Sequence, residues 1–196
     1  EAAVGDQWER VFAVVATGGT TNFGIVDNIA SIAEVAQRHA TWVHVDGAYG
    51  LAGMFAPSTK AFFAGIDKVD SFIVDPHKWL FTPFDSCALL YRDPEIARLA
   101  HTQHAEYLDA LTDSTEYNPS DYSVQLTRRA RGLPLWFSLA TFGAQAYRDA
   151  IRAIGAFEVP ALVGIPSRLY VLTTAVFESM TTMPPKYNKP PSKRKT

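Results

Sequence analysis

The segment Val11–Asp46, VFAVVATGGTTNFGIVDNIASIAEVAQRHATWVHVD, decides the fold. It opens with a short, continuous, β-branched apolar run at residues 11–16, which is typical of a strand buried on both faces. From Ile29 onward apolar side chains recur at helical spacing, and Asp27 just before them is expected to cap that helix. Residues 42–46 then form a second strand. This order predicts a βαβ unit with parallel strands and a right-handed crossover.

The rest of the chain extends this unit into one α/β domain. Polar residues dominate 101–123, which we expect to be a long loop with at most one helical turn. Together with the βαβ unit, the remaining elements predict a mainly parallel sheet flanked by helices. The further elements predicted are strands at 71–74 and 87–91, both buried, a helix at 94–100 begun by Asp93-Pro94, and a long helix at 133–154.

Composition excludes several classes of protein. Of 196 residues, 47% are hydrophobic and 19% charged, which is globular, and the net charge of −2 gives no case for a nucleic-acid partner. Apolar runs stay below the ~20 residues that span a bilayer, so we expect no membrane association. The single cysteine, Cys87, excludes an internal disulfide and a multi-cysteine metal site. We expect a cytoplasmic protein with no metal.

Polar residues cluster where the predicted strands end, the edge at which open α/β sheets bind ligands. They are Thr20-Thr21, Asp46, residues 75–78 (DPHK) and Phe84-Asp85. Each alone has a structural explanation: a turn cap for the threonines and Asp46, a hydrogen-bonded histidine, a solvated lysine.

Their combination favours chemistry. Lys78 lies between Val74 and the apolar run 79–81, and desolvation there would free its amine to attack a carbonyl. Asp46, at the mouth of the neighbouring strand, is the partner that a pyridinium nitrogen needs.

Four motifs carry a resemblance to a known family: residues 16–21 (ATGGTT), 44–50 (HVDGAYG), 75–80 (DPHKWL) and 121–129 (DYSVQLTRR). In this order and spacing they resemble the pyridoxal-phosphate-dependent group II amino-acid decarboxylases, which include aromatic amino-acid, histidine and glutamate decarboxylases. The resemblance covers roughly residues 8 to 153. It implies part of the large domain of a fold-type I enzyme that uses pyridoxal 5'-phosphate.

The resemblance also implies how four residues hold the cofactor. Lys78 matches the lysine that forms a Schiff base with the cofactor aldehyde. Asp46 matches the acid that keeps the pyridine nitrogen protonated. Ala48 matches the small residue against one ring face, and Thr21 the hydroxyl near the phenolic oxygen.

Three more residues match with further implications. His77 matches the histidine that contacts cofactor or substrate. Asp75 stands where many relatives have asparagine; it can still accept a hydrogen bond, but it adds charge near the phosphate. Tyr107 matches a mobile-loop tyrosine that reaches the partner subunit's site in a homodimer and protonates the α-carbon.

The implied activity is decarboxylation of an L-amino acid to an amine and CO₂. The run Phe84–Cys87 favours an aromatic substrate. Three alternative functions remain open: an aldehyde synthase or an aminotransferase on the same scaffold, and a non-catalytic remnant. Tyr107 argues against the aldehyde synthase.

Family members are more than twice this length. The resemblance therefore implies an internal piece that lacks the phosphate-gripping turn, the histidine that stacks on the ring and the small domain. We expect residues 1–157 to be a partial large domain and 158–196 to be divergent and poorly ordered. The last fifteen residues carry five bases, no acid and four of the twelve prolines.

Overall fold

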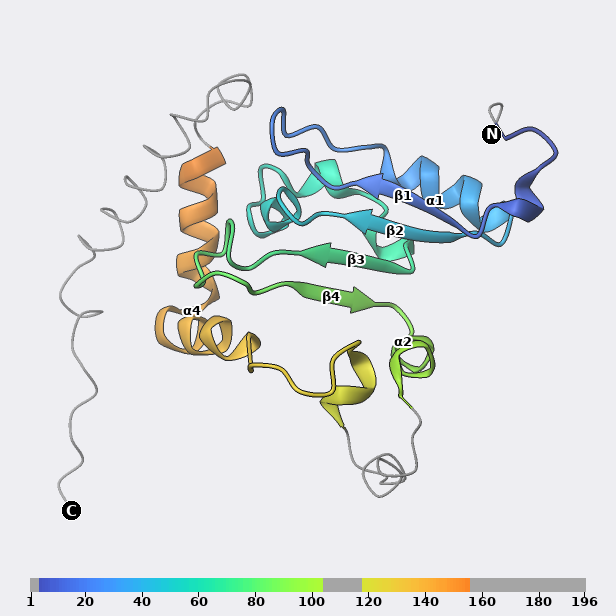
Figure 1. Cartoon of the computed structure of the whole chain (residues 1–196). Coiled ribbons are helices and arrows are strands. Elements are labelled where there is room, and N and C mark those ends of the chain that lie inside the picture. The colour runs from blue at the N-terminus through green and yellow to red at the C-terminus, as the bar shows by residue number, and fades with distance from the viewer. Residues whose placement is uncertain (1–3, 104–117, 156–196) are drawn as a thin grey trace, which may run out of the picture.

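The computed structural model describes residues 4–103 and 118–155. Within them a four-stranded sheet runs in the order β1 (Ala13–Thr17), β2 (Trp42–Asp46), β3 (Ser71–Val74) and β4 (Ala88–Tyr91). Strands β1, β2 and β3 are parallel, and β4 is antiparallel to β3 (Figure 1). The predicted mainly parallel sheet is therefore confirmed, with an antiparallel edge strand that the pattern did not indicate.

Helical segments fill the β1–β2 and β2–β3 connections and follow β4, while β3 and β4 are joined by a turn without a helix. The predicted helices at 94–100 and 133–154 are confirmed with ends shifted by one residue. In the described part of the polar segment Pro119–Tyr122 forms a helical turn, whereas residues 104–117 lie outside the described residues. The helices are α1 (Ile29–Arg38), α2 (Pro94–His101) and α4 (Gly132–Gly155), with short 3-10 turns η1 (Trp8–Arg10), η2 (Leu51–Phe55), η3 (Lys60–Phe63), η4 (Ile66–Lys68) and η6 (Pro119–Tyr122).

The cap of α1 differs from the prediction by one residue. Asn28 caps the helix, because its Oδ1 accepts the Ser31 N–H at 3.1 Å. Asp27 instead accepts the Thr17 N–H through Oδ2 at 2.8 Å, and its own N–H donates to the Thr17 carbonyl at 2.9 Å. Asp27 thus fixes the chain where it leaves β1, which sequence spacing alone could not distinguish from a cap.

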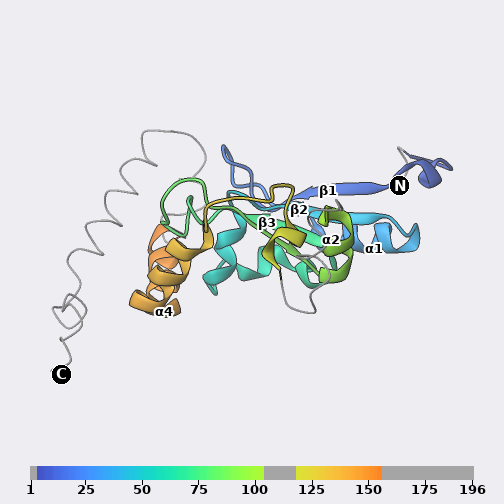
Figure 2. The ribbon, with the colours of Figure 1, turned by 60° about the horizontal axis from the view of Figure 1, so that its bottom comes forward.

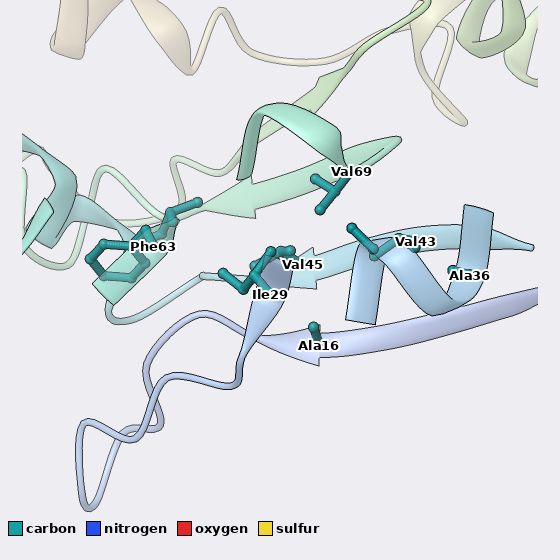
Figure 3. Packing of buried hydrophobic residues seen from close by; sticks show 9 residues of the cluster. Ala16, Ile29, Ala36, Val43, Val45, Phe63 and Val69 are labelled. Atoms are coloured by element: carbon teal, nitrogen blue, oxygen red, sulfur yellow. The ribbon is translucent and has the colours of Figure 1, made fainter. Parts of the chain in front are cut away.

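One face of the sheet carries the main core. Val43 and Val45 of β2 pack with Ile29 and Ala36 of α1, and Phe63 belongs to the same cluster (Figure 3). The view in Figure 2 shows α1 and the 3-10 turns that follow β2 on the same side of the sheet. Right-handed crossovers between parallel strands put both connections there.

The opposite face is more open than predicted. Val15 of β1 is 64% exposed and Leu89 of β4 is 45% exposed, so the predictions that the first strand is buried on both faces and that the fourth strand is buried were wrong. Both strands bound the sheet, and the crossover segments cover only the α1 face. An apolar run marks a strand without telling how many of its faces are covered.

A second core joins α4 to the sheet. Tyr147 and Ile151 of α4 pack with Ala52 and Ala56 from the segment after β2 and with Leu80 from the turn after β3. Gly143 interrupts α4 with φ 77° and ψ 158°, a conformation that glycine adopts without steric cost. Through Leu80, α4 packs directly against the turn that follows Lys78.

A polar group is buried on the open face of the sheet. Ser71 is 4% exposed; its Oγ accepts the Trp42 Nε1–H at 3.0 Å and lies 2.8 Å from Nδ1 of His44. Burial lowers the pKa of His44, and the carboxylate of Asp46 opposes this only in part.

This lowered pKa predicts a pH dependence of stability. Below pH ~6.5, the ordinary pKa of histidine, the unfolded chain binds a proton at position 44 that the folded chain resists. We therefore expect the free energy of unfolding to fall as the pH drops from 7.5 to 5. Urea titrations of wild type and His44→Gln should show a flatter profile in the variant. Equal slopes in the two proteins would rule out His44 as the source.

Candidate active site at the carboxyl ends of the parallel strands

The turns that follow β1, β2 and β3 are held side by side beyond the ends of the strands. The Gly18 N–H donates to the Asp46 carbonyl at 2.7 Å, and the Asp75 N–H donates to the Ala48 carbonyl at 3.2 Å. These two bonds extend the parallel pairing past the strand ends, where Thr17 pairs with Asp46 and Asp46 with Ile73. Three of the four predicted polar features are thereby brought to one edge of the sheet.

Two glycines allow this close approach. A Cβ on Gly19 would lie 2.7 Å from the Cα of Gly50, and a Cβ on Gly50 would lie 2.6 Å from the Cα of Gly19. Gly19 also has φ +105°, in the region that side chains disfavour. The first and second turns of the site therefore pack backbone against backbone.

Asp46 ends β2 on the sheet face opposite α1. Its Oδ1 accepts the N–H of Ala48 at 3.2 Å, which folds the turn back over the carboxylate, and the residue is exposed. Asp46 and Ala48, predicted from the sequence as neighbours in one site, do contact each other. The carboxylate is accessible to a ligand.

Lys78 lies in the turn after β3 and pairs with Asp75. Its Nζ is 2.8 Å from Oδ2 of Asp75, whose side chain is only 12% exposed, and its backbone N–H donates to the Asp75 carbonyl at 3.0 Å. The lysine side chain is 35% exposed. Lys78 is thus partly shielded from water and has a carboxylate partner, but solvent can still reach its amine.

His77 points from the same turn toward the start of β4. Its Nδ1 is 2.5 Å from the Ser86 carbonyl, its Nε2 is 4.0 Å from Oδ2 of Asp75, and the ring of Phe84 packs edge-on at 5.0 Å between centroids. His77 and Lys78 therefore both face the same carboxylate oxygen, Oδ2 of Asp75.

Thr21 lies in the turn that follows β1. It is exposed and lines a cavity of about 100 Å³ together with Tyr49 and Trp79, whose rings pack edge-to-face at 5.4 Å. Thr20, by contrast, has a structural role, because its Oγ1 accepts the Ile25 N–H at 3.0 Å. The lining of this cavity includes neither Lys78 nor Asp46. Tyr107 lies outside the described residues.

Sequence reasoning missed Cys87 as a member of this cluster. Although the residue as a whole is exposed, burial of its thiol raises the pKa to about 11, and the carboxylate of Asp75 adds to this by a hydrogen bond and by its charge, while Lys78 opposes it. The thiol therefore lies beside the same carboxylate as Lys78.

The raised pKa predicts slow alkylation of Cys87. The thiolate is the reacting species, so at pH 7.5 iodoacetamide should modify Cys87 about tenfold or more slowly than a free cysteine. The rate should still be rising at pH 10. Asp75→Asn removes a negative charge and should move the inflection to lower pH, as mass spectrometry of the alkylated chain can follow. An inflection near pH 8.5 in wild type would contradict this assignment.

The comparison with protein families decides the classification. The family model described as the pyridoxal-dependent decarboxylase conserved domain matches residues 1–158. The chain belongs to the pyridoxal-dependent decarboxylase family. The resemblance found in the four motifs is thereby confirmed, and the motifs for Lys78 and Asp46 lie within the matched residues.

Individual relatives of this decarboxylase-family chain support the same family assignment. It is 36% identical to aromatic-L-amino-acid decarboxylase of Bacillus atrophaeus over 145 residues, 73% of this chain and 30% of the relative. It is 36% identical, with a TM-score of 0.69, to the structure of Oryza sativa TDC with PLP and tryptamine, over 74% of this chain and 30% of that one. Rhodiola rosea 4-hydroxyphenylacetaldehyde synthase is 28% identical with a TM-score of 0.59, over 75% and 31%. The chain spans about 30% of the length of the relatives that it matches.

The side chains at this edge of the family domain fit an aldehyde-bearing pyridine cofactor. An amine suited to an aldehyde (Lys78) and a carboxylate suited to a ring nitrogen (Asp46) lie at the ends of adjacent strands. Residues 4–103 and 118–155 contain no group of three or more metal-binding side chains and no helix able to cross a membrane.

Proposed function

We propose that this chain is the cofactor-lysine segment of a pyridoxal-phosphate-dependent decarboxylase that converts an aromatic L-amino acid to its amine and CO₂. The observation that carries the proposal is that the accessible Lys78 amine and the exposed Asp46 carboxylate follow two adjacent parallel strands at the same edge of the sheet. The names of the relatives support the aromatic substrate class. The complete protein would be a cytoplasmic homodimer.

In this proposal the residues of the chain divide the work. Lys78 would hold the cofactor aldehyde through Nζ, which now pairs with Asp75. Asp46 holds a proton on the ring nitrogen by charge complementarity. Bound pyridoxal phosphate supplies the electron sink that accepts the bonding pair when CO₂ departs. Ala48 would leave room for the ring, Thr21 would place its hydroxyl near the phenolic oxygen, His77 would contact cofactor or substrate, and Tyr107 would deliver the proton to the α-carbon.

A second candidate reaction is aldehyde formation. It is favoured by the likeness to Rhodiola rosea 4-hydroxyphenylacetaldehyde synthase and opposed by the tyrosine at position 107. The two reactions release different products from the same substrate.

The test measures products and the point of cofactor attachment together. The protein containing this segment is incubated with pyridoxal phosphate and L-tryptophan, L-tyrosine or L-glutamate, and CO₂, amine and aldehyde are quantified. Separately, the 196-residue chain is treated with pyridoxal phosphate and borohydride and then mapped by mass spectrometry. Equal yields of amine and CO₂ from an aromatic substrate and an adduct on Lys78 are expected. An aldehyde product would select the second candidate, and the absence of both CO₂ and adduct would indicate a non-catalytic remnant.

A further inference from the structure

The turn between Lys78 and β4 has an unusual backbone. Phe81 and Asp85 have φ of 54° and 80°, and among the described residues other than glycine only Ala40 shares this left-handed conformation. Such conformations are unfavourable for residues with a Cβ and persist only where surrounding contacts impose them. Two of them within five residues, directly after the candidate lysine, call for a physical cause.

At Asp85, two arginines from a distant part of the chain supply that cause. The Asp85 carboxylate forms an ion pair with Nη2 of Arg129, and Nε of Arg131 lies 3.4 Å from the same oxygen. Nε of Arg131 is buried and has no hydrogen-bond partner, so the charge of Asp85 is its compensation. Both arginines belong to the segment that leads into α4, more than forty residues away from Asp85.

A second contact clamps the next residue of the turn. Ser86 is 5% exposed, and its Oγ–H donates to the Arg131 carbonyl at 3.2 Å. The backbone of Asp85 and Ser86 is therefore held by the arginine segment through one charged and one neutral contact. The direction of the Ser86 carbonyl group is fixed as a result.

That carbonyl determines the state of His77. A carbonyl oxygen only accepts hydrogen bonds, so Nδ1 of His77, 2.5 Å from the Ser86 oxygen, carries the proton. Nε2 then faces Oδ2 of Asp75 at 4.0 Å, the oxygen that also holds Nζ of Lys78 at 2.8 Å. The orientation and tautomer of this ring thus depend on the clamped turn.

We propose that Arg129 and Arg131 position His77 beside Lys78, acting through Asp85 and the Ser86 carbonyl. Asp85 and the two arginines are positioning residues that need not touch cofactor or substrate. The value of this arrangement for catalysis rests on the proposed function, whereas the positioning itself is a property of the chain without any cofactor.

The test reads the imidazole directly. In the 196-residue chain labelled with ¹⁵N-histidine, long-range ¹H–¹⁵N spectra report which nitrogen of each ring carries the proton, and His77→Gln assigns the signal. Asp85→Asn removes the charge while keeping a residue that tolerates a left-handed backbone, and Asp85→Gly also removes the strain. Asp149→Asn is the matched control, because it breaks the Arg152 ion pair on α4 far from the turn in sequence.

We expect wild type and Asp149→Asn to show a single Nδ1–H form of His77, and both Asp85 variants to lose it in favour of a tautomer mixture. Arg129→Gln, which changes an exposed side chain, should give the same loss in part and provides the answer if the Asp85 variants do not fold. An unchanged Nδ1–H form in the folded variants, accompanied only by lower melting temperatures, would show a merely structural tie and overturn the proposal.

A second measurement separates this proposal from the proposed function. The rate at which pyridoxal phosphate attaches to Lys78, fixed by borohydride, should fall several-fold in Asp85→Asn and stay unchanged in Asp149→Asn. If the Asp85 variants lose the Nδ1–H form of His77 but pyridoxal phosphate does not attach to Lys78 even in wild type, the cofactor role is refuted and the positioning stands. If pyridoxal phosphate attaches to Lys78 but the His77 signal is the same in wild type and in the Asp85 variants, only the positioning is refuted.

Discussion

Replacing Lys78 by alanine or arginine should abolish the borohydride-fixed adduct of pyridoxal phosphate, from one per chain to none. Alanine has no amine, and the guanidinium of arginine stays protonated and does not attack an aldehyde. The measurement is the mass of the reduced chain and the position of the modified peptide. Lys68→Ala is the matched control, because Lys68 is an exposed lysine whose partner, Glu34, lies at 3.4 Å.

Loss of Lys78 also leaves the Asp75 carboxylate without its cation, which destabilises the fold by itself. The double variant Lys78→Ala/Asp75→Asn removes that unpaired charge and separates loss of the nucleophile from loss of stability. An adduct that persists at unchanged stoichiometry in the single and double variants would identify another lysine as the point of attachment.

Replacing Asp46 should have the largest effect on turnover while sparing attachment. Electrostatic stabilisation by one positioned group contributes about 10²–10³-fold, and a full charge on the reacting ring should contribute at least the upper value. Asp46→Asn keeps an oxygen that can accept the Ala48 N–H, so it isolates the charge from the shape of the turn. We expect kcat to fall by about 10³-fold or more.

The assay for Asp46 uses the protein that contains this segment, with amine release and adduct formation at Lys78 measured in parallel. Asp67→Ala, at an exposed position in η4, serves as the control and should leave both unchanged. A kcat near that of wild type in Asp46→Asn would remove the carboxylate from the mechanism.

Local pattern predicted the elements of the fold well because each carries its own signal. The bounds of β2 and β3 and the start of α1 at Ile29 agree with the sequence prediction, since short apolar runs and helical spacing are read within a few residues. The antiparallel direction of β4 carries no local signal. Neither does the exposure of Val15 and Leu89, because both depend on which segments cover the sheet.

The candidate site divides in the same way. Asp46 and Lys78 follow predictable strands, so the topology alone brings them to one edge. The contact between Asp75 and Lys78 depends on the form of a single turn, and the ion pairs of Asp85 with Arg129 and Arg131 join residues more than forty positions apart. Contacts of this kind are set by the assembled fold, and a single sequence does not reveal them.

The order of the strands has a practical consequence for handling this protein. Within the described residues β1 forms one border of the sheet, and nearby Phe12 is 89% exposed. A border strand with unpaired backbone groups and apolar neighbours is a template for pairing with a second molecule. Concentrated samples of the isolated chain should therefore self-associate through this strand. A charged substitution such as Val15→Lys, on the open face, is the change of choice for keeping it monomeric during the spectroscopic tests.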